Sequence, residues 1–325
     1  MFDPITSTGA KFGVMLFAIV LFVAIVGFIL FLADRLGNTK SDRAVATLFL
    51  LPTVVLITLG LLYPAVRTIY QSFLDENGRN FVGLDNYATL FTESEQRIVL
   101  RNTFIWVLIT PFLATFIGLV YSILVDRIRG EAVAKALIFL PMAISMVGAS
   151  IIWKFVYEFR PADVDQIGLV NQILVLLHIA PQQLIITTPW NTLLLIVVVI
   201  WIQAGFAMTV LSASIKAIPD DMNEAASLDG VNALERFRFI TVPSIRPALI
   251  VVLTTIAIGT LKAFDIVRTM TGGQFETSVI ANEFYTQAFR NFNSGLGAAL
   301  AVALFILVIP IVVYNIRQLR QSEAR

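Results

Sequence analysis

The chain has 325 residues, of which 58% are hydrophobic and only 14% charged, and its net charge is +1 at pH 7. Soluble domains are nearer half apolar and a quarter charged, so this composition excludes a water-soluble fold and predicts an all-α membrane protein. The small net charge gives no reason to expect nucleic-acid binding, and the absence of cysteine excludes disulfides, zinc–cysteine sites and thiol chemistry.

Seven apolar runs follow one another along the chain, each long enough for a helix that crosses the hydrocarbon core of a bilayer. They cover residues 12–33, 44–68, 102–125, 136–156, 190–215, 247–264 and 294–315. The first run, Phe12 to Ala33, has neither the basic front nor the small-residue cleavage site of a secretory signal, so we expect it to be retained as a helix. The sixth is the weakest, because Lys262 and Asp265 interrupt its far end.

The basic residues near the ends of these runs predict the orientation of the chain in the membrane. Of the 23 Lys and Arg residues, 13 lie in short segments on one side, namely Arg35, Lys40, Arg43, Arg127, Arg129, Lys135, Lys216, Arg236, Arg238, Arg246, Arg317, Arg320 and Arg325. On the other side, acidic residues outnumber basic ones in the two longer loops, 70–101 and 157–189. The first side is therefore predicted to be cytoplasmic, with the N-terminus outside and the C-terminus inside.

The long polar interruption near the middle of the chain, residues 216–247, predicts two short helices joined by a turn. Its signals are Pro219 at the first helix start, Gly230 at that helix's end, the pair Asn232 and Glu235, and the prolines Pro243 and Pro247. Proline fits the first turn of a helix, and glycine commonly ends one in a left-handed conformation. An Asn followed three residues later by Glu caps a second helix reciprocally. Because proline lacks the N–H that a helix interior needs, we expect the second helix to stop before the next apolar run.

The first of these short helices carries a distinctive set of residues. Met222, Ala225, Ala226 and Asp229 share one face by helical spacing, and two alanines allow another backbone to approach closely. Glu224-Ala225-Ala226, Gly230, Ile240 and Pro243 also fit the pattern EAA, three residues, G, nine residues, I-x-L-P, with Val242 in place of Leu. This resembles the signature loop by which permeases of binding-protein-dependent ABC importers dock into a groove on a cytoplasmic ATPase. An ordinary amphipathic surface loop is the alternative.

Other segments resemble the carbohydrate-uptake (maltose-type) branch of this family. They are the extra first helix, the turns at 81–87 and 168–171, and the stretch from Phe264-Asp265 to Thr271-Gly272-Gly273. The resemblance implies a six-helix permease core over 44–325, with its coupling loop at 216–247. Residues 1–43 would then be an additional N-terminal transmembrane helix and its cytoplasmic connection.

The resemblance also implies partners and a cellular location. The chain would be one permease subunit in the cytoplasmic membrane of a prokaryote, paired with a sister permease, two ATPase subunits and an extracytoplasmic sugar-binding protein. ATP and Mg would be bound by the ATPase subunits, and no cofactor or metal is expected in this chain. Met222, Glu224, Ala225, Ala226, Asp229 and Gly230 would form the contact with the ATPase, with Glu224 pairing a basic group and the small residues permitting close seating.

Three groups of residues are candidates for the substrate pathway, because polar or aromatic side chains within apolar helices are costly unless they face a cavity. They are Met142 and Met146; Val199, Gln203 and Phe206 at i, i+4, i+7 spacing; and Thr260, Lys262, Phe264 and Asp265 with Arg268. These positions resemble those that line the sugar site of maltose-type permeases. The alternatives are ordinary packing for the two methionines, an interhelical hydrogen bond for Gln203, and mutual neutralisation of Lys262, Asp265 and Arg268.

The residues give no sign of catalysis, since neither a G-x-x-x-x-G-K-[ST] phosphate loop, a nucleophile elbow nor a His/Glu metal spacing occurs. We therefore predict a transport subunit without its own ATPase motifs, importing a di- or oligosaccharide or a glycoside. The first alternative is a secondary transporter coupled to ions, which is weakened because no acidic residue lies at the middle of any run. The second is a seven-helix receptor.

Overall fold

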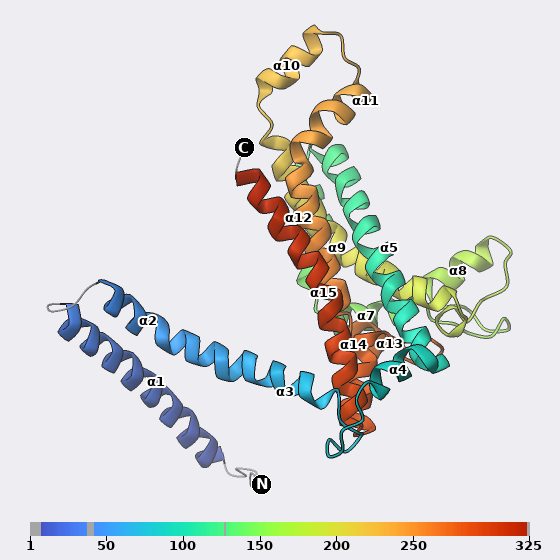
Figure 1. Ribbon diagram of the computed structural model, residues 1–325. Coiled ribbons are helices and arrows are strands. Elements are labelled where there is room, and N and C mark those ends of the chain that lie inside the picture. The colour runs from blue at the N-terminus through green and yellow to red at the C-terminus, as the bar shows by residue number, and fades with distance from the viewer. Residues whose placement is uncertain (1–7, 38–41, 127, 324–325) are drawn as a thin grey trace. The chain divides into compact units, whose positions relative to one another are not determined.

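The computed structural model describes residues 8–37, 42–126 and 128–323, and over these ranges its regular elements are helices apart from an isolated β-bridge between Leu74 and Phe81 (Figure 1). The α-helices are α1 (Thr8–Gly37), α2 (Asp42–Ile57), α3 (Tyr63–Gln71), α4 (Asp85–Thr92), α5 (Ser94–Val125), α6 (Glu131–Phe139), α7 (Met146–Val156), α8 (Leu169–Leu176), α9 (Trp190–Lys216), α10 (Asp220–Leu228), α11 (Ala233–Arg236), α12 (Val242–Leu261), α13 (Asp265–Met270), α14 (Ile280–Tyr285) and α15 (Ser294–Glu323). Short 3₁₀ turns cover Leu140–Ala143 and Leu184–Ile186, and π-helical turns cover Thr58–Leu62, Phe237–Thr241 and Thr286–Arg290.

The chain divides into two compact units, one ending at Arg67 and the other beginning at Thr68. In the first unit, α1 and α2 contact one another, and within this unit taken by itself the described apolar side chains from Phe49 to Tyr63 are almost all exposed. Such a surface is expected of a segment that faces lipid or another subunit. The functional boundary predicted after residue 43 stays a prediction.

The second unit is a helical bundle built around α5 and α9, with α12 and α15 packed beside them. Its core contains Trp106 of α5, Leu195 and Leu211 of α9, and Ile256 of α12, each no more than 1% exposed. Long apolar runs form helices in a bilayer, because an α-helix pairs its backbone N–H and C=O groups internally where no water is available. Pro111 of α5 and Pro310 of α15 both lie inside unbroken helices.

The expected single helix over 136–156 was wrong, because the chain bends there by 102°. Helix α6 ends at Phe139, a 3₁₀ turn over Leu140–Ala143 contains Pro141, and Ile144 is extended. The hydroxyl of Ser145 then accepts a hydrogen bond from the backbone N–H of Gly148 (3.0 Å) and caps the start of α7. Proline removes one helical donor, and the serine cap offers a favourable new start, so the two together make a break more favourable than continuation.

The expectation that Pro243 and Pro247 stop the second loop helix was also wrong. Helix α11, the π turn over Phe237–Thr241 and α12 form one continuous helical segment from Ala233 to Leu261. Pro243 lies in the first turn of α12, directly after the π turn, and Pro247 lies inside the helix. Local π geometry re-satisfies backbone groups that a proline leaves free, as membrane helices commonly allow.

Five helical segments among the described residues are long and apolar enough to cross a membrane. They are Phe49–Gln71, Ser94–Val125, Trp190–Lys216, Ala233–Leu261 and Ser294–Gln318. The bent pair Glu131–Ala143 and Met146–Val156 gives a sixth if it counts as one broken span, and α1 contains a shorter apolar stretch over Phe12–Phe28. The structure therefore confirms an all-helical membrane fold with five or six such segments, against the seven expected.

The end of the second unit opposite α10 contains a firmly held loop between α13 and α14 (Figure 1). Phe275 and Glu276 both have left-handed backbone angles, with φ of 56° and 58°, which cost about 1–3 kcal/mol each in non-glycine residues. The side-chain amide of Asn102 donates to the carbonyl oxygens of Glu276 (2.6 Å) and Ser278 (3.1 Å). Asn191 likewise donates to the carbonyl oxygen of Phe275 (2.6 Å). These bonds from α5 and α9 fix the shape of the loop.

Candidate functional site

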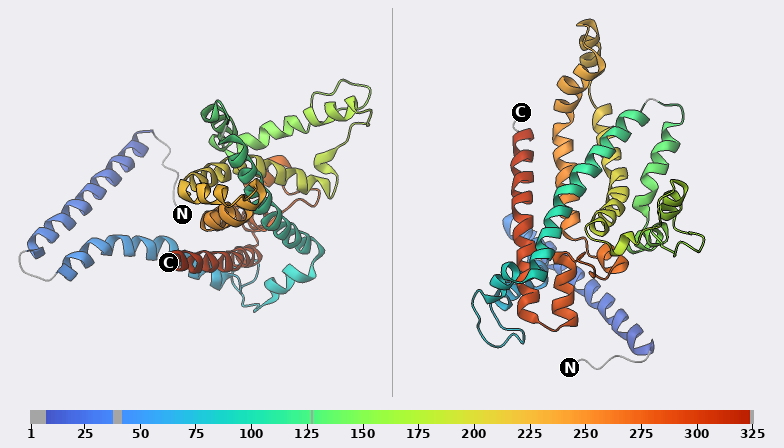
Figure 2. Two further views of the ribbon diagram at one scale, coloured as in Figure 1. Left: turned by 90° about the horizontal axis from the view of Figure 1, so that it is seen from above. Right: turned by 90° about the vertical axis from the view of Figure 1, so that its right-hand side faces the viewer.

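The polar interruption between α9 and α12 forms a helical loop that projects beyond the end of the bundle (Figure 1; Figure 2, right). Helix α10 begins at Asp220, one residue later than predicted, with Pro219 as its extended N-cap. Asp220 and Asp221 occupy the first turn, where negative charge is favoured by the helix dipole. The predicted two-helix loop is therefore confirmed at this first helix.

The turn that ends α10 depends on Gly230. Its φ of 73° lies in the left-handed region, as predicted for this glycine, and its N–H donates to the carbonyl oxygen of Ser227 (3.3 Å). The next residue, Val231, donates to the carbonyl oxygen of Ala226 (3.1 Å). These two bonds satisfy carbonyl groups that the helix end leaves without partners. The turn is a well-formed helix C-cap.

The predicted capping box opens α11. The side-chain oxygen of Asn232 accepts from the N–H of Glu235 (2.9 Å), and the carboxylate of Glu235 accepts from the N–H of Asn232 (3.0 Å). A cap of this kind contributes about 1 kcal/mol to helix stability. It sets the direction in which the chain leaves the loop and enters the continuous segment 233–261.

Most of the loop surface is exposed within this chain. Of the six predicted coupling residues, Met222, Glu224, Ala225, Asp229 and Gly230 are exposed, whereas Ala226 is only 6% exposed. Glu224 also lines a shallow groove of about 480 Å³ together with Asp220, Asn223, Ser227 and Leu228. Apolar side chains accompany these polar ones, since Leu228 and Leu234 are 89% and 74% exposed. Such a mixed polar and apolar surface is typical of a protein-binding site.

The second predicted group lies on α9, in the middle of the bundle. Val199 is 3% exposed and belongs to the hydrophobic core, and Phe206 is half-buried against the same core. Gln203 lies between them and is half-buried. Its side-chain nitrogen would be 3.8 Å from a Cβ placed on Gly259, so the amide lies beside the backbone of α12. The structure thus brings Gln203 next to the helix that carries Thr260.

The other two predicted groups lie at helix ends. Met142 is 41% exposed in the 3₁₀ turn after α6, and Met146 opens α7 and packs against the core. Thr260 is buried and donates to the carbonyl oxygen of Ile256 in its own helix (2.8 Å). Phe264 is half-buried and packs on Tyr285, with the ring centroids 5.0 Å apart.

The three charged residues after α12 do not neutralise one another. Lys262 and Asp265 are exposed and Arg268 is half-buried, and within this described segment no ion pair joins any two of them. The guanidinium of Arg268 instead lies 4.9 Å from the ring centroid of Tyr285, a cation–π arrangement. Lys262 and Asp265 are therefore available to solvent or to a ligand in the isolated chain.

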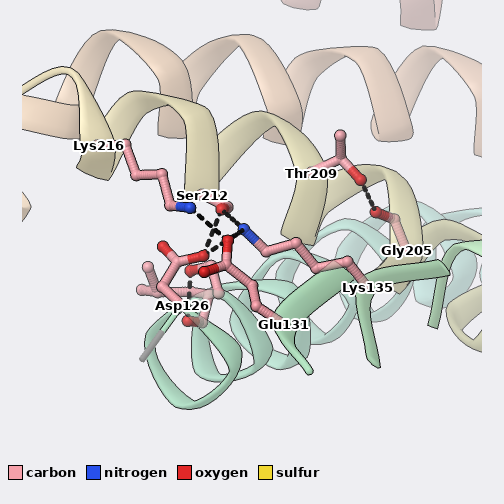
Figure 3. A network of polar contacts seen from close by, with 9 residues as sticks. Asp126, Glu131, Lys135, Gly205, Thr209, Ser212 and Lys216 are labelled. Atoms are coloured by element: carbon pink, nitrogen blue, oxygen red, sulfur yellow. Dashed lines mark hydrogen bonds and ion pairs between the residues drawn. The ribbon is translucent and has the colours of Figure 1, made fainter. Parts of the chain in front are cut away.

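A polar network lies at the base of the loop and was not predicted from the sequence (Figure 3). It joins Asp126 at the end of α5, Glu131 and Lys135 of α6, and Ser212 and Lys216 of α9. From the sequence, Lys135 and Lys216 were expected only to be among the basic residues that set the orientation of the chain. The four-residue spacing of Glu131 and Lys135 was a usable signal for one ion pair, but nothing in the sequence related either residue to Lys216.

Comparison with known proteins identifies the family. Residues 96–321 match the family described as "Binding-protein-dependent transport system inner membrane component". This chain belongs to that family. It is 44% identical over 276 residues to an osmoprotective compounds uptake permease protein of Synechocystis sp., covering 85% of this chain and 99% of the relative. It is 48% identical over 271 residues to an alpha-glucoside transport system permease protein of Rhizobium meliloti, covering 83% of this chain and 81% of the relative.

The fold agrees with this assignment. A subunit of a bacterial ABC transporter for import of the acidic polysaccharide alginate superposes with a TM-score of 0.75 at 20% identity, covering 88% of this chain and 99% of that one. Family membership decides among the alternatives left open by the sequence. The chain is an inner membrane component of a transport system, and the ion-coupled carrier and the seven-helix receptor are set aside.

Proposed function

We propose that this permease is a membrane subunit of an ATP-driven importer for a di- or oligosaccharide or a glycoside. The observation that carries the proposal is the exposed loop with Glu224, Ala225 and Gly230, which projects from a bundle of this family. The substrate class follows from the relatives, which are named for α-glucosides and for osmoprotective compounds. A sugar has apolar C–H faces and a ring of hydroxyls, which suit aromatic and amide side chains such as Phe206 and Gln203.

The proposed topology has seven transmembrane segments. Segment 12–33 would be the additional N-terminal span, and the bent pair α6–α7 would count as one broken span. The N-terminus would be outside and the C-terminus cytoplasmic, which places α10 and α11 on the cytoplasmic side. Support comes from the 13 basic residues on that side and from the family's location in the inner membrane.

The proposed assembly pairs this chain with a sister permease, two cytoplasmic ATPase subunits and an extracytoplasmic sugar-binding protein. ATP and Mg would be bound by the ATPase subunits, because this sequence has no phosphate-binding loop of its own. Closure of the ATPases on ATP would draw the paired loops together and turn the central cavity outward, and hydrolysis would reset it. Glu224 would pair a basic group of the ATPase, while Met222, Ala225, Asp229 and Gly230 would lie in the contact, with Ala226 supporting the helix from within.

Reconstitution tests the proposed function directly. We expect vesicles that contain the complete complex, the binding protein and internal ATP to accumulate an α-glucoside such as maltose, and vesicles that contain this chain alone to accumulate none under an ion gradient. The physical reason is that, in this proposal, the free energy of ATP binding and hydrolysis reaches the chain only through its exposed loop. Uptake by the isolated chain, driven by a proton or sodium gradient without an ATPase, would contradict the proposal.

Gln203→Ala tests the proposed substrate pathway. We expect the apparent affinity for the transported sugar to fall about fivefold, because a hydrogen bond made by a partly buried amide contributes on the order of 1 kcal/mol. The measurement is uptake at several sugar concentrations by the reconstituted complex. Thr209→Ala is the matched control, since Thr209 lies on the same helix and its hydroxyl donates only to the carbonyl oxygen of Gly205 (2.9 Å). Unchanged kinetics of the Gln203 variant across several sugars would remove this residue from the pathway.

A further inference from the structure

The network at the base of the loop joins three helices through four charged side chains and one hydroxyl (Figure 3). The ammonium of Lys135 contacts a carboxylate oxygen of Asp126, the hydroxyl of Ser212 and, at 2.8 Å, the carboxylate of Glu131. Ser212 also donates to Asp126 (2.6 Å), and the ammonium of Lys216 contacts the same Glu131 oxygen. The two carboxylates and two ammonium groups balance in charge, so the network holds together without an outside ion.

The network lies directly at the start of the coupling loop. Lys216 is the last residue of α9, and α10 begins only four residues later, at Asp220. Ser212 lies one turn earlier on the same side of α9. A displacement of α10 that reaches α9 therefore acts first on the two residues of α9 that are bonded to the segment 126–135.

A second contact joins α6 and α9 deeper in the bundle. A Cβ on Gly205 would overlap the carbonyl oxygen of Ile138 and lie 3.0 Å from the Cα of Phe139, so the two backbones touch there. Gly205 is eleven residues before Lys216 on α9, or about 16 Å at the helical rise of 1.5 Å per residue. Two helices held at points this far apart cannot easily pivot about either one. Directly beyond Phe139, the chain enters the 3₁₀ turn that contains Met142.

We propose that Glu131, Lys135 and Lys216 are positioning residues that make α6 and α9 move as one body when the coupling loop is displaced. The motion would reach the turn at Met142 and the face of α9 at Gln203 together. This inference rests on the proposed function, since it assigns the route by which the loop drives the substrate pathway. It follows from two separated contacts between α6 and α9. One is the polar network that includes Glu131 and Lys216, and the other is the close backbone approach at Gly205.

The burial of the four charged groups shows which of them to change. The side chains of Asp126 and Lys135 are 10% and 23% exposed, and removal of Lys135 would leave Asp126 as an uncompensated, poorly solvated charge. The side chain of Lys216 is 51% exposed, so its loss leaves the Glu131–Lys135 pair intact and adds no buried charge. Lys216 is therefore the position at which the ion pair with Glu131 can be removed while the fold and the contact of Lys135 with Ser212 are kept.

The test compares Lys216→Met with the conservative variant Lys216→Arg in the complete reconstituted complex. We expect Lys216→Met to lower the number of sugar molecules imported per ATP hydrolysed roughly three- to tenfold, as mutations along a coupling route do, while complex assembly is kept. Lys216→Arg should restore the ratio, because it keeps the charge next to Glu131. Arg317→Met is the matched control, since Arg317 lies on α15 and its removal takes one exposed basic group from the same proposed side. A parental ratio in Lys216→Met would overturn the inference.

A cross-linking measurement tests independently whether α6 and α9 separate during the transport cycle. The chain has no cysteine, so Glu131→Cys with Lys216→Cys introduces the only thiols. We expect joining them with a short bis-methanethiosulfonate reagent to leave uptake at or above the uncross-linked level, because the pair does not separate during the cycle. Loss of uptake on cross-linking, reversed by reduction, would show that α6 and α9 part and would overturn the inference. The parental complex serves as reference: if it imports no sugar with ATP, the proposed function itself fails.

Discussion

Gly230→Pro is expected to reduce ATP-driven uptake at least tenfold and to release the ATPase subunits from the membrane complex. Proline fixes φ near −65°, whereas Gly230 has a φ of 73°, and proline also removes the N–H that donates to Ser227. The turn between α10 and α11 cannot form with either change, so Glu224 and Ala225 lose their position. The measurements are uptake by vesicles and the amount of ATPase that co-purifies with the permease.

The matched control at this position is Gly230→Asn. Asparagine tolerates the left-handed conformation better than most residues with a side chain, and it sometimes takes the place of glycine at helix C-caps of this kind. Nothing lies within 4 Å of a Cβ built on Gly230, so the added side chain has room. We expect this variant to keep most of its uptake and its ATPase. Full activity of the proline variant would show that the turn does not contribute to docking.

Gly205→Ala is expected to destabilise the bundle by about 1–3 kcal/mol, the usual cost of adding a methyl group where no space exists. The Cβ would overlap the carbonyl oxygen of Ile138, a backbone atom that cannot turn aside as a side chain can. For a domain of this size, such a change lowers the thermal midpoint by roughly 3–10 °C. The measurement is the unfolding temperature of the purified complex.

A second glycine within a membrane helix provides the comparison. A Cβ on Gly259 of α12 would meet only the side-chain nitrogen of Gln203, at an ordinary contact distance of 3.8 Å. We therefore expect Gly259→Ala to leave the midpoint within about a degree of the parental value, since removing glycine from a helix interior is itself mildly favourable. Equal midpoints for the two alanine variants would mean that α6 and α9 do not touch at Gly205.

Local signals in the sequence predicted the helical loop between α9 and α12 well. Gly230 and the Asn232–Glu235 pair act on their immediate neighbours, through a backbone angle and two short-range hydrogen bonds, so their consequences could be stated without the rest of the fold. Hydropathy was equally sufficient for α5, α9 and α15, because an apolar run of that length has few other stable conformations in lipid.

Whether a given proline interrupts its helix could not be predicted from the sequence alone. Pro111 and Pro310 lie inside unbroken helices, Pro247 also lies inside a helix, and only Pro141 accompanies a break. The outcome depends on what surrounds each proline: Ser145 offers a new cap after Pro141, whereas a π turn precedes Pro243 and keeps the segment continuous. Hydropathy measures the affinity of a run for lipid and carries no information about these hydrogen bonds.

The prediction of the substrate-pathway residues was limited for a different reason. The spacing of Val199, Gln203 and Phe206 predicted that they share one face of a helix and line a cavity. In the structure, however, Val199 is only 3% exposed within this chain. Which helix lies against that face is a tertiary property, as is the pairing of Lys216 with Glu131 across 85 positions of sequence. Their assignment as substrate contacts remains a prediction that the Gln203 variant tests.

The two sides of the loop differ in helical continuity. On one side, the three residues from Ala217 to Pro219 join α9 to α10 without helical structure, whereas on the other the 29 residues from Ala233 to Leu261 form a single rod about 44 Å long. Under the proposed function, a tilt that begins at Ala233 would be passed along this continuous helix toward Lys262 and Phe264, which follow its last residue. In that proposal, a displacement of the loop would therefore reach the substrate pathway through this continuous helix as well as through α9.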